Sequence, residues 1–167
     1  QAMLDVHITG PFRILRAFSS WLRPQAKKES EEHGRAQCRK IVNVSSVSGT
    51  QGSATQIAYS AGKAGVVGLT KTLAKEWGRY NVTVNAVAFG PIETRLTQTY
   101  KEDPPTIEVD GRQHKVGLHS NQVEAMQAAS PLGRSGQPED AAGAIYLFCI
   151  PPSDFVTGEV LTCSGGL

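Results

Sequence analysis

Tyr59 and Lys63 are the two residues of this sequence whose types and spacing best suit acid–base chemistry. They are four positions apart in a segment with helical periodicity, so we expect both side chains to lie on one face of a helix. A free tyrosine ionises near pH ~10, and a lysine ammonium close by favours the phenolate. We therefore expect Lys63 to lower the pKa of Tyr59, which would let the phenol exchange a proton with a substrate near neutral pH.

Ser46 adds a second polar group, at the end of a segment that we predict to be a buried strand. Its hydroxyl could hydrogen-bond the same substrate oxygen that Tyr59 protonates, which suits a carbonyl being reduced or an alcohol being oxidised. A tyrosine four residues before a lysine is by itself usually a surface pair. The case for function depends on the context, which is a strand ending in serines followed by small residues around the tyrosine.

The elements that would position these side chains alternate between helices and buried strands. Buried strands alternating with helices predict an α/β fold with a parallel sheet and helices on both faces. Ligands in such sheets bind at the carboxyl ends of the strands, where Ser46 is expected. The predicted order is a helix at 2–22 ending before Pro24, a strand at 40–46, a loop at 47–55, a helix at 56–77 stopped by Gly78, a strand at 82–88, a long irregular stretch at 92–130, a helix at 138–149 and a strand at 159–163.

Two shorter elements are expected inside the stretch 92–130. Residues 106–109 and 113–116 flank Asp110-Gly111, a sequence typical of a tight hairpin turn. Residues 121–129 have the composition of a short helix.

Composition excludes several classes of protein. The chain has 167 residues, of which 40% are hydrophobic and 19% charged, as in ordinary soluble globular domains. A formal charge of +2 gives no reason to expect nucleic acid or a membrane surface as a partner, and no apolar run reaches the roughly eighteen residues of a membrane span. Three cysteines without metal-ligand spacing predict no metal site and favour a cytoplasmic, reducing compartment.

The segment 24–39 carries many charges of both signs. We interpret it as a solvated helical extension or loop, whose reason for being there the sequence does not reveal. A nucleic-acid site over residues 23–40 is the weaker alternative, because three glutamates offset the basic residues and only Trp21 lies near as an aromatic platform. The chain also starts at Gln1, in a helix without a start signal, so we expect it to be part of a longer protein.

Four stretches of the sequence resemble the short-chain dehydrogenase/reductase family. Together they cover nearly all of the chain except 24–39 and about 98–129. The resemblance implies a Rossmann-like doubly wound parallel sheet, with residues 1–167 as the C-terminal, catalytic part of a single domain and 92–130 as a substrate lid. The N-terminal half with the glycine-rich phosphate loop would be absent. The stretches are IVNVSSVSGTQGSATQIAYSAGKAGVVGLTKTLAKEW (41–77), VTVNAVAFGPIETRLT (82–97), PLGRSGQPEDAAGAIYLF (131–148) and VTGEVLTCSGGL (156–167).

The resemblance also implies a role for each matching residue. Tyr59 would be the general acid or base, Ser46 would orient the carbonyl, and Lys63 would bind the nicotinamide ribose. Ile92 and Thr94 would contact the carboxamide end of the nicotinamide of NAD or NADP. The sequence is most similar to 3-oxoacyl-[acyl-carrier-protein] reductases of fatty acid metabolism, which implies an acyl thioester or another small carbonyl or alcohol substrate and a homotetramer or homodimer.

The sequence departs from the family pattern at two places besides the missing half. His7 stands where the family has an asparagine that supports a proton-relay water, and an imidazole could either do the same or be satisfied by backbone groups without a catalytic part. Phe89 replaces the usual proline, and Pro91 follows the glycine instead. These changes leave open a catalytically impaired subunit that assembles with an active partner, although the intact Ser46, Tyr59 and Lys63 argue against it.

Overall fold

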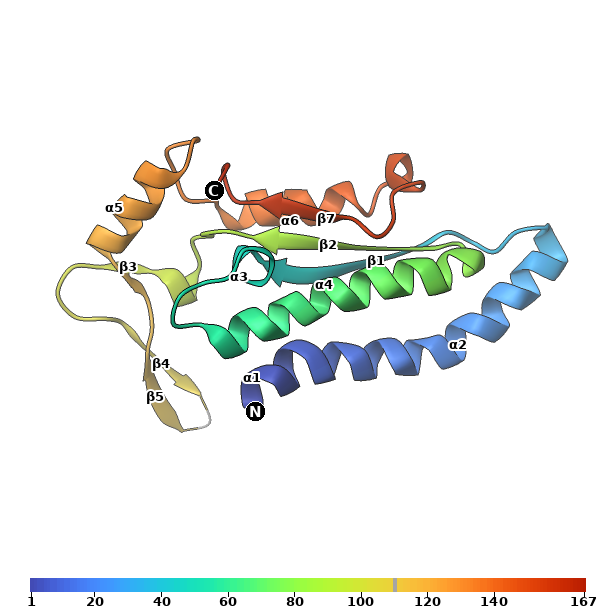
Figure 1. Cartoon of the computed structure of the whole chain (residues 1–167), viewed down its shortest axis with the longest axis horizontal. Coiled ribbons are helices and arrows are strands. Elements are labelled where there is room, and N and C mark those ends of the chain that lie inside the picture. Colours follow the sequence, from blue (N-terminus) through green and yellow to red (C-terminus); the bar gives the residue numbers. More distant parts are fainter. Residues whose placement is uncertain (110) are drawn as a thin grey trace. The chain divides into compact units, whose positions relative to one another are not determined.

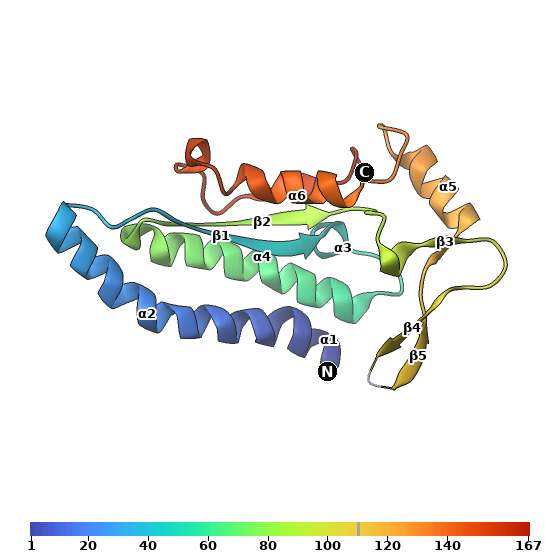
Figure 2. The same cartoon turned by 180° about the vertical axis from the view of Figure 1, so that it is seen from behind.

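The computed structural model describes residues 1–109 and 111–167, which form two compact units. The first unit comprises residues 1–88 and 144–162, and the second comprises residues 89–143 and 163–167. Figures 1 and 2 follow the chain through both units from opposite sides. That residues 1–167 belong to one domain, with 92–130 as its lid, stays a prediction.

A three-stranded sheet confirms the predicted α/β class. Its order is β1 (Arg39–Ser46), β2 (Val82–Phe89) and β7 (Val160–Cys163), and the three arrows point the same way in Figure 1. The central strand β2 is buried along almost its whole length, as expected for a strand with neighbours on both sides. Its fully buried Asn85 is satisfied by the segment before β7, because its amide donates to the carbonyl of Val156 and its oxygen accepts from the N–H of Glu159.

Two long helical segments lie side by side on one face of this sheet (Figures 1 and 2). The first runs through α1 (Ala2–Leu4), a π-helical turn η1 (Asp5–Thr9) and α2 (Gly10–His33), and the second is α4 (Ile57–Trp77). The last residues of α6 (Pro138–Leu147), from Ala144 on, belong to the same unit. The buried cluster between the two long segments and the sheet consists of Leu15, Leu22, Ala74, Trp77, Val82 and Val84.

The predicted helix end before Pro24 is wrong, because α2 continues through this proline to His33. A proline inside a helix leaves the carbonyl four residues earlier without its donor. Here that carbonyl belongs to Ser20, an exposed residue, so water can replace the lost donor. Leu22 and Ala26 are buried on either side of Pro24 and hold the helix against the core. The helical extension expected for the charged segment is therefore present, and it ends at Gly34 in the left-handed region, with φ of 76°.

The expected loop 47–55 is corrected over its first four residues. A short helix α3 (Val47–Thr50) begins directly after β1, with Ser46 as its N-cap. The predicted helix stop at Gly78 is confirmed, because α4 ends at Trp77 with Gly78 as its C-cap. Gly78 has a right-handed conformation and starts a 3₁₀ turn, η2 (Gly78–Tyr80). The left-handed residue that ends this turn is Asn81, with φ of 57°, because an asparagine tolerates this region better than most residues.

The stretch 92–130 is more regular than the sequence indicates. It contains the 3₁₀ turn η3 (Arg95–Thr97), a parallel pair β3 (Thr99–Tyr100) and β6 (Leu118–His119), an antiparallel pair β4 (Thr106–Val109) and β5 (Arg112–Lys115), and the helix α5 (Ser120–Ala129). The predicted hairpin is confirmed in β4 and β5, while Asp110 of its turn lies outside the described residues. Helix α6 ends at Leu147, two residues earlier than expected, and a 3₁₀ turn η4 (Pro151–Ser153) precedes β7. Across residues 1–109 and 111–167, no helix combines the length and apolar character needed to cross a membrane.

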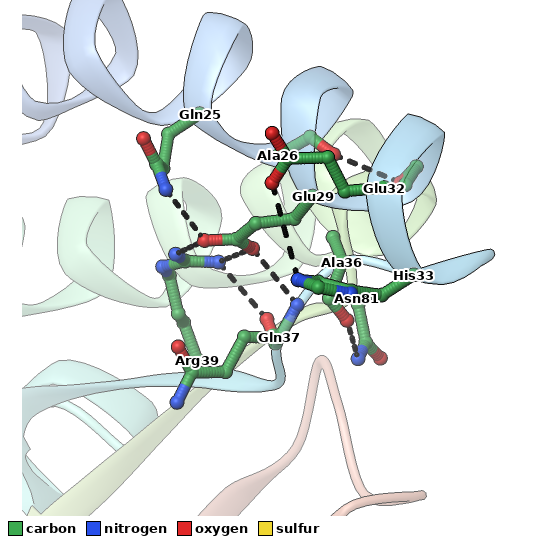
Figure 3. A network of polar contacts seen from close by, with 10 residues as sticks. Gln25, Ala26, Glu29, Glu32, His33, Ala36, Gln37, Arg39 and Asn81 are labelled. Carbon is green, nitrogen blue, oxygen red and sulfur yellow. Dashed lines mark hydrogen bonds and ion pairs between the residues drawn. The ribbon is translucent and has the colours of Figure 1, made fainter.

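A polar network joins the end of α2 to the start of β1 (Figure 3). The Glu29 carboxylate accepts two hydrogen bonds from the Arg39 guanidinium, one from the side chain of Gln25 at 2.8 Å and one from the N–H of Gln37 at 2.9 Å. Arg39 also lies 5.2 Å from the ring centroid of Trp21. These donors lower the pKa of Glu29 from 4.5 to about 2, with the Arg39 hydrogen bond as the largest cause. The network therefore ties the charged extension of α2 to the sheet.

Replacing Glu29 by glutamine should lower the melting temperature of the protein at pH 7 by a few degrees, because the guanidinium of Arg39 loses its charged partner. Glu31→Gln is the matched control, since Glu31 is on the same helix in an exposed pair with Lys27 and such pairs contribute little. A carboxylate with a depressed pKa stabilises the fold above its unfolded pKa and loses this contribution as the pH falls. The difference between wild type and Glu29→Gln should therefore shrink between pH 4.5 and about 2. Equal melting temperatures of the two variants at pH 7 would contradict this role.

Candidate functional site

Ser46, Tyr59 and Lys63 lie in neighbouring elements of the first unit. Tyr59 is in the first turn of α4, Lys63 is one turn further along, and Ser46 is the last residue of β1. Ser46 is 8% exposed, and the two α4 side chains are half-buried. The predicted arrangement of a strand end beside the start of a helix is therefore present.

Lys63 joins the end of β1 to α4 through its side chain and its backbone. Its ammonium donates a hydrogen bond to the carbonyl of Val44 at 3.0 Å, and its own carbonyl accepts one from the hydroxyl of Ser45 at 2.9 Å. The ammonium nitrogen lies 5.8 Å from the centroid of the Tyr59 ring. Burial lowers the pKa of Lys63, because the charged form loses contact with water. The site thus contains a partly desolvated positive charge beside a phenol.

Ser46 is fixed by the short helix that follows it. Its hydroxyl oxygen accepts a hydrogen bond from the N–H of Ser48 at 3.2 Å, the usual interaction of an N-cap serine. Helix α3 lies close to α4, since a Cβ added to Gly49 would be only 2.6 Å from the carbonyl carbon of Lys63. The position of Ser46 relative to Lys63 is therefore set by a contact that only glycine allows at position 49.

His7 lies beside Tyr59, in the π-helical turn η1. The two ring centroids are 5.1 Å apart and the ring planes are nearly perpendicular, at 89°. The pKa of His7 is lowered, first by burial and second by the positive charge of Lys63. The structure thus brings His7 to the predicted site, while its chemical role stays a prediction.

The small residues at the start of α4 have a structural explanation. A Cβ added to Gly62 would lie 2.9 Å from the Cβ of His7, and one added to Gly65 would lie 2.0 Å from the Cδ1 of Ile8. The sequence predicts the close approach of another backbone or of a ligand at these positions. The element that approaches is η1.

Ile92 and Thr94 belong to the second unit, whereas Ser46, Tyr59 and Lys63 belong to the first. Ile92 forms a backbone bridge with Gly136. Thr94 is the N-cap of η3, where its hydroxyl accepts from the N–H of Leu96 and its N–H donates to the hydroxyl of Thr97 at 2.8 Å. Their contact with a nicotinamide stays a prediction.

Three groups that contribute to the site were not predicted from the sequence. The Val44 carbonyl has no sequence signature, because every residue has a carbonyl. Ser45 is visible as part of a serine pair, but the pair does not reveal which hydroxyl turns toward α4. Gly49 gives the one usable signal, a glycine shortly after a strand that ends in serines. In the part of the chain that the structure describes, no three His, Cys, Asp or Glu side chains gather as metal ligands would.

Gly62→Ala should lower the stability of the protein, although alanine is the better helix former, because the new methyl group would push His7 and η1 away from α4. Gly68→Ala is the matched control on the same helix, since a Cβ there meets nothing within 4 Å. The control should be more stable than wild type by up to about 1 kcal/mol. Urea unfolding of the three proteins measures both effects. Stabilisation of equal size in both variants would contradict the close contact at Gly62.

Known proteins resemble this chain along its whole length. A family model described as "Enoyl-(Acyl carrier protein) reductase" matches residues 1–167. The chain is 36% identical to a 3-oxoacyl-[acyl-carrier-protein] reductase of Synechocystis sp. over 168 aligned positions, which cover 100% of this chain and 55% of the relative. A protein of the same name from Vibrio cholerae is 36% identical, over 99% of this chain and 56% of its own length. The chain therefore spans about half the length of the curated relatives it matches.

Solved structures give the same result. A short chain dehydrogenase from Bacillus anthracis is 29% identical, with a TM-score of 0.68 over 97% of this chain and 53% of its own. A 4-hydroxyisoleucine dehydrogenase complexed with NADH and succinate is 26% identical, with a TM-score of 0.70 over 98% of this chain and 56% of its own. With its parallel sheet and a family match along its whole length, the chain belongs to the short-chain dehydrogenase/reductase family and is similar to its 3-oxoacyl-[acyl-carrier-protein] reductases.

Proposed function

We propose that the protein is an oxidoreductase that uses NAD or NADP to interconvert a ketone and a secondary alcohol, with a 3-oxoacyl or 3-hydroxyacyl thioester as its substrate. The observation that carries the proposal is the partly desolvated ammonium of Lys63, 5.8 Å from the Tyr59 ring and hydrogen-bonded to the strand that ends in Ser46. The substrate class comes from the relatives named 3-oxoacyl-[acyl-carrier-protein] reductase. The nucleotide is supported by a structural neighbour described as a complex with NADH.

Each of the three residues has one role in this proposal. In the direction of reduction, Tyr59 gives its hydroxyl proton to the carbonyl oxygen, and Ser46 donates a hydrogen bond to the same oxygen. The phenolate that remains is stabilised by the ammonium of Lys63. The nicotinamide dinucleotide, when bound, supplies the hydride to the carbonyl carbon. In the direction of oxidation, Tyr59 accepts the proton of the alcohol.

The residues of the site fit such a cofactor. An ammonium has three donors, and the Val44 carbonyl takes one of those of Lys63, so ribose hydroxyls could accept the others. Ile92 and Thr94 are the proposed contacts of the carboxamide. We place the enzyme in the cytoplasm as a homotetramer or homodimer.

The geometry favours reduction of a carbonyl over reduction of a carbon–carbon double bond. The family description names an enoyl reductase, whereas the relatives at 36% identity are named 3-oxoacyl reductases. A donor at the strand end and a phenol on the adjacent helix are suited to a single oxygen that gains a proton. An enoyl thioester is therefore the informative substrate to compare with the ketone.

The test is to follow the absorbance of NADPH and NADH with acetoacetyl thioester or crotonyl thioester, using the whole protein. Tyr59→Phe should reduce kcat with the ketone by about 10² to 10⁴, the usual contribution of a general acid, while the KM for the nucleotide changes little. Tyr146→Phe is the matched control, because Tyr146 is 65% exposed on α6, and it should keep the rate of wild type.

Turnover of the ketone that survives in Tyr59→Phe would show that the assignment of the general acid is wrong. Turnover of crotonyl thioester alone would refute the substrate class. No turnover with either nucleotide, together with a stable complex with an active reductase, would favour the catalytically impaired subunit.

A further inference from the structure

The turn that carries His7 departs from ordinary helix geometry. Residues Asp5–Thr9 form a π-helical turn, in which the N–H of Gly10 donates to the carbonyl of Asp5, five residues earlier. Such a turn adds a residue to one turn of a helix and changes the direction of the side chains around it, and it is frequent at functional sites. The turn lies between α1 and α2, directly against α4.

Two close contacts hold this turn against the helix of Tyr59. The Cβ of His7 lies where a side chain at position 62 would be, and the Cδ1 of Ile8 lies where one at position 65 would be. Both positions are glycine, so the backbone of α4 leaves room for η1 at the level of Tyr59. The Cβ of His7 is thereby packed against the backbone of α4, which places its ring beside Tyr59.

The ring of His7 meets the ring of Tyr59 in an orientation that aromatic pairs prefer. A centroid distance of 5.1 Å and an angle of 89° describe a T-shaped pair. The ammonium nitrogen of Lys63, a residue of α4, lies 5.8 Å from the centroid of the same Tyr59 ring. The phenol ring is therefore contacted by an imidazole from η1 and by an ammonium from its own helix.

Burial and the charge of Lys63 favour the neutral form of His7. Burial and the positive charge of Lys63 lower its pKa, in that order. The acid on its own turn is Asp5, whose carboxylate accepts hydrogen bonds from Gln1 at 3.0 Å and Thr9 at 3.4 Å. Helix α1 has no titratable side chain, and the first charged residue of α2 is Arg13.

We propose that His7 is a positioning residue for the proposed reaction: its neutral imidazole holds the ring of Tyr59 in the orientation that reaches the substrate oxygen, and protonation of the imidazole beside Lys63 releases it. This role rests on the proposed function and differs from the support of a relay water. In this role, the protonation state of His7 controls the orientation of the general acid Tyr59. Activity should then fall as the pH drops below the range in which His7 is neutral.

The direction of the pH effect follows from the lowered pKa. The folded state binds a proton at His7 less readily than the unfolded chain does, whose histidine has the ordinary value of 6.5. Between the folded pKa and 6.5 the unfolded state therefore binds more protons, so the contribution of His7 to stability rises with pH across this range and is complete above 6.5.

Two variants at position 7 separate positioning from support of a water. His7→Phe keeps a ring against Tyr59 and removes the titration, whereas His7→Asn keeps a hydrogen-bonding side chain and removes the ring. With acetoacetyl thioester at pH 7.5, His7→Phe should keep kcat within about twofold of wild type, and His7→Asn should lose up to about tenfold, the range that an aromatic pair supplies. The decline of kcat at acidic pH should be weaker in both variants. The reverse order, with His7→Asn active and His7→Phe impaired, would overturn the proposal in favour of a relay water.

The contact between His7 and Tyr59 can also be tested by a measurement that needs no enzymatic activity. The ring resonances of Tyr59 and Tyr146 are followed by NMR between pH 8 and pH 5 in protein with labelled tyrosine, and are assigned with Tyr59→Phe and Tyr146→Phe. The Tyr59 resonance should shift together with the His7 titration, at a pH below 6.5, and should stay constant in His7→Phe. The Tyr146 resonance should stay constant in all proteins. A Tyr59 resonance that does not shift as His7 titrates would overturn the proposal, whether or not the protein has the proposed activity.

Discussion

The contact between the end of β1 and the second turn of α4 is the constraint on which the proposed site depends. Two hydrogen bonds form it, from the Lys63 ammonium to the Val44 carbonyl and from the Ser45 hydroxyl to the Lys63 carbonyl. They fix the ammonium beside the Tyr59 ring and place Ser46, the next residue of the strand, at the same helix. Because burial already disfavours the charged form of Lys63, an anionic neighbour is stabilised there more than it would be in water.

Glycines allow α3 and η1 to approach α4 closely, and those inside α4 lower its helix stability. Each glycine inside α4 costs about 1 kcal/mol relative to alanine. Gly62 and Gly65 let η1 reach α4, and Gly49 lets α3 pack on the backbone of Lys63. The same small residues that weaken the helix therefore bring His7, Tyr59, Lys63 and Ser46 into neighbouring positions. Helix propensity is therefore low at the positions where the proposed chemistry needs close packing.

The strands and the candidate catalytic residues could be predicted from the sequence because their signals are local. The β-branched run before Ser46 and the apolar stripe of α4 identify their elements directly. The continuation of α2 past Pro24 could not be found in this way, because it depends on tertiary burial of Leu22 and Ala26 and on the ion pair between Glu29 and Arg39. The π-helical turn was missed for a related reason, since the glycines that accommodate it lie more than fifty residues later in the chain.

A crystal structure of the whole protein with a nicotinamide dinucleotide and an unreactive 3-oxoacyl thioester analogue would test the central claim most directly. We expect one ligand oxygen to lie within about 2.6–3.2 Å of both the Tyr59 hydroxyl and the Ser46 hydroxyl. We also expect the Lys63 ammonium to hydrogen-bond the ribose while it keeps its hydrogen bond to the Val44 carbonyl. A ligand oxygen bound away from Tyr59, or a Lys63 that leaves β1 when the nucleotide binds, would contradict the central claim.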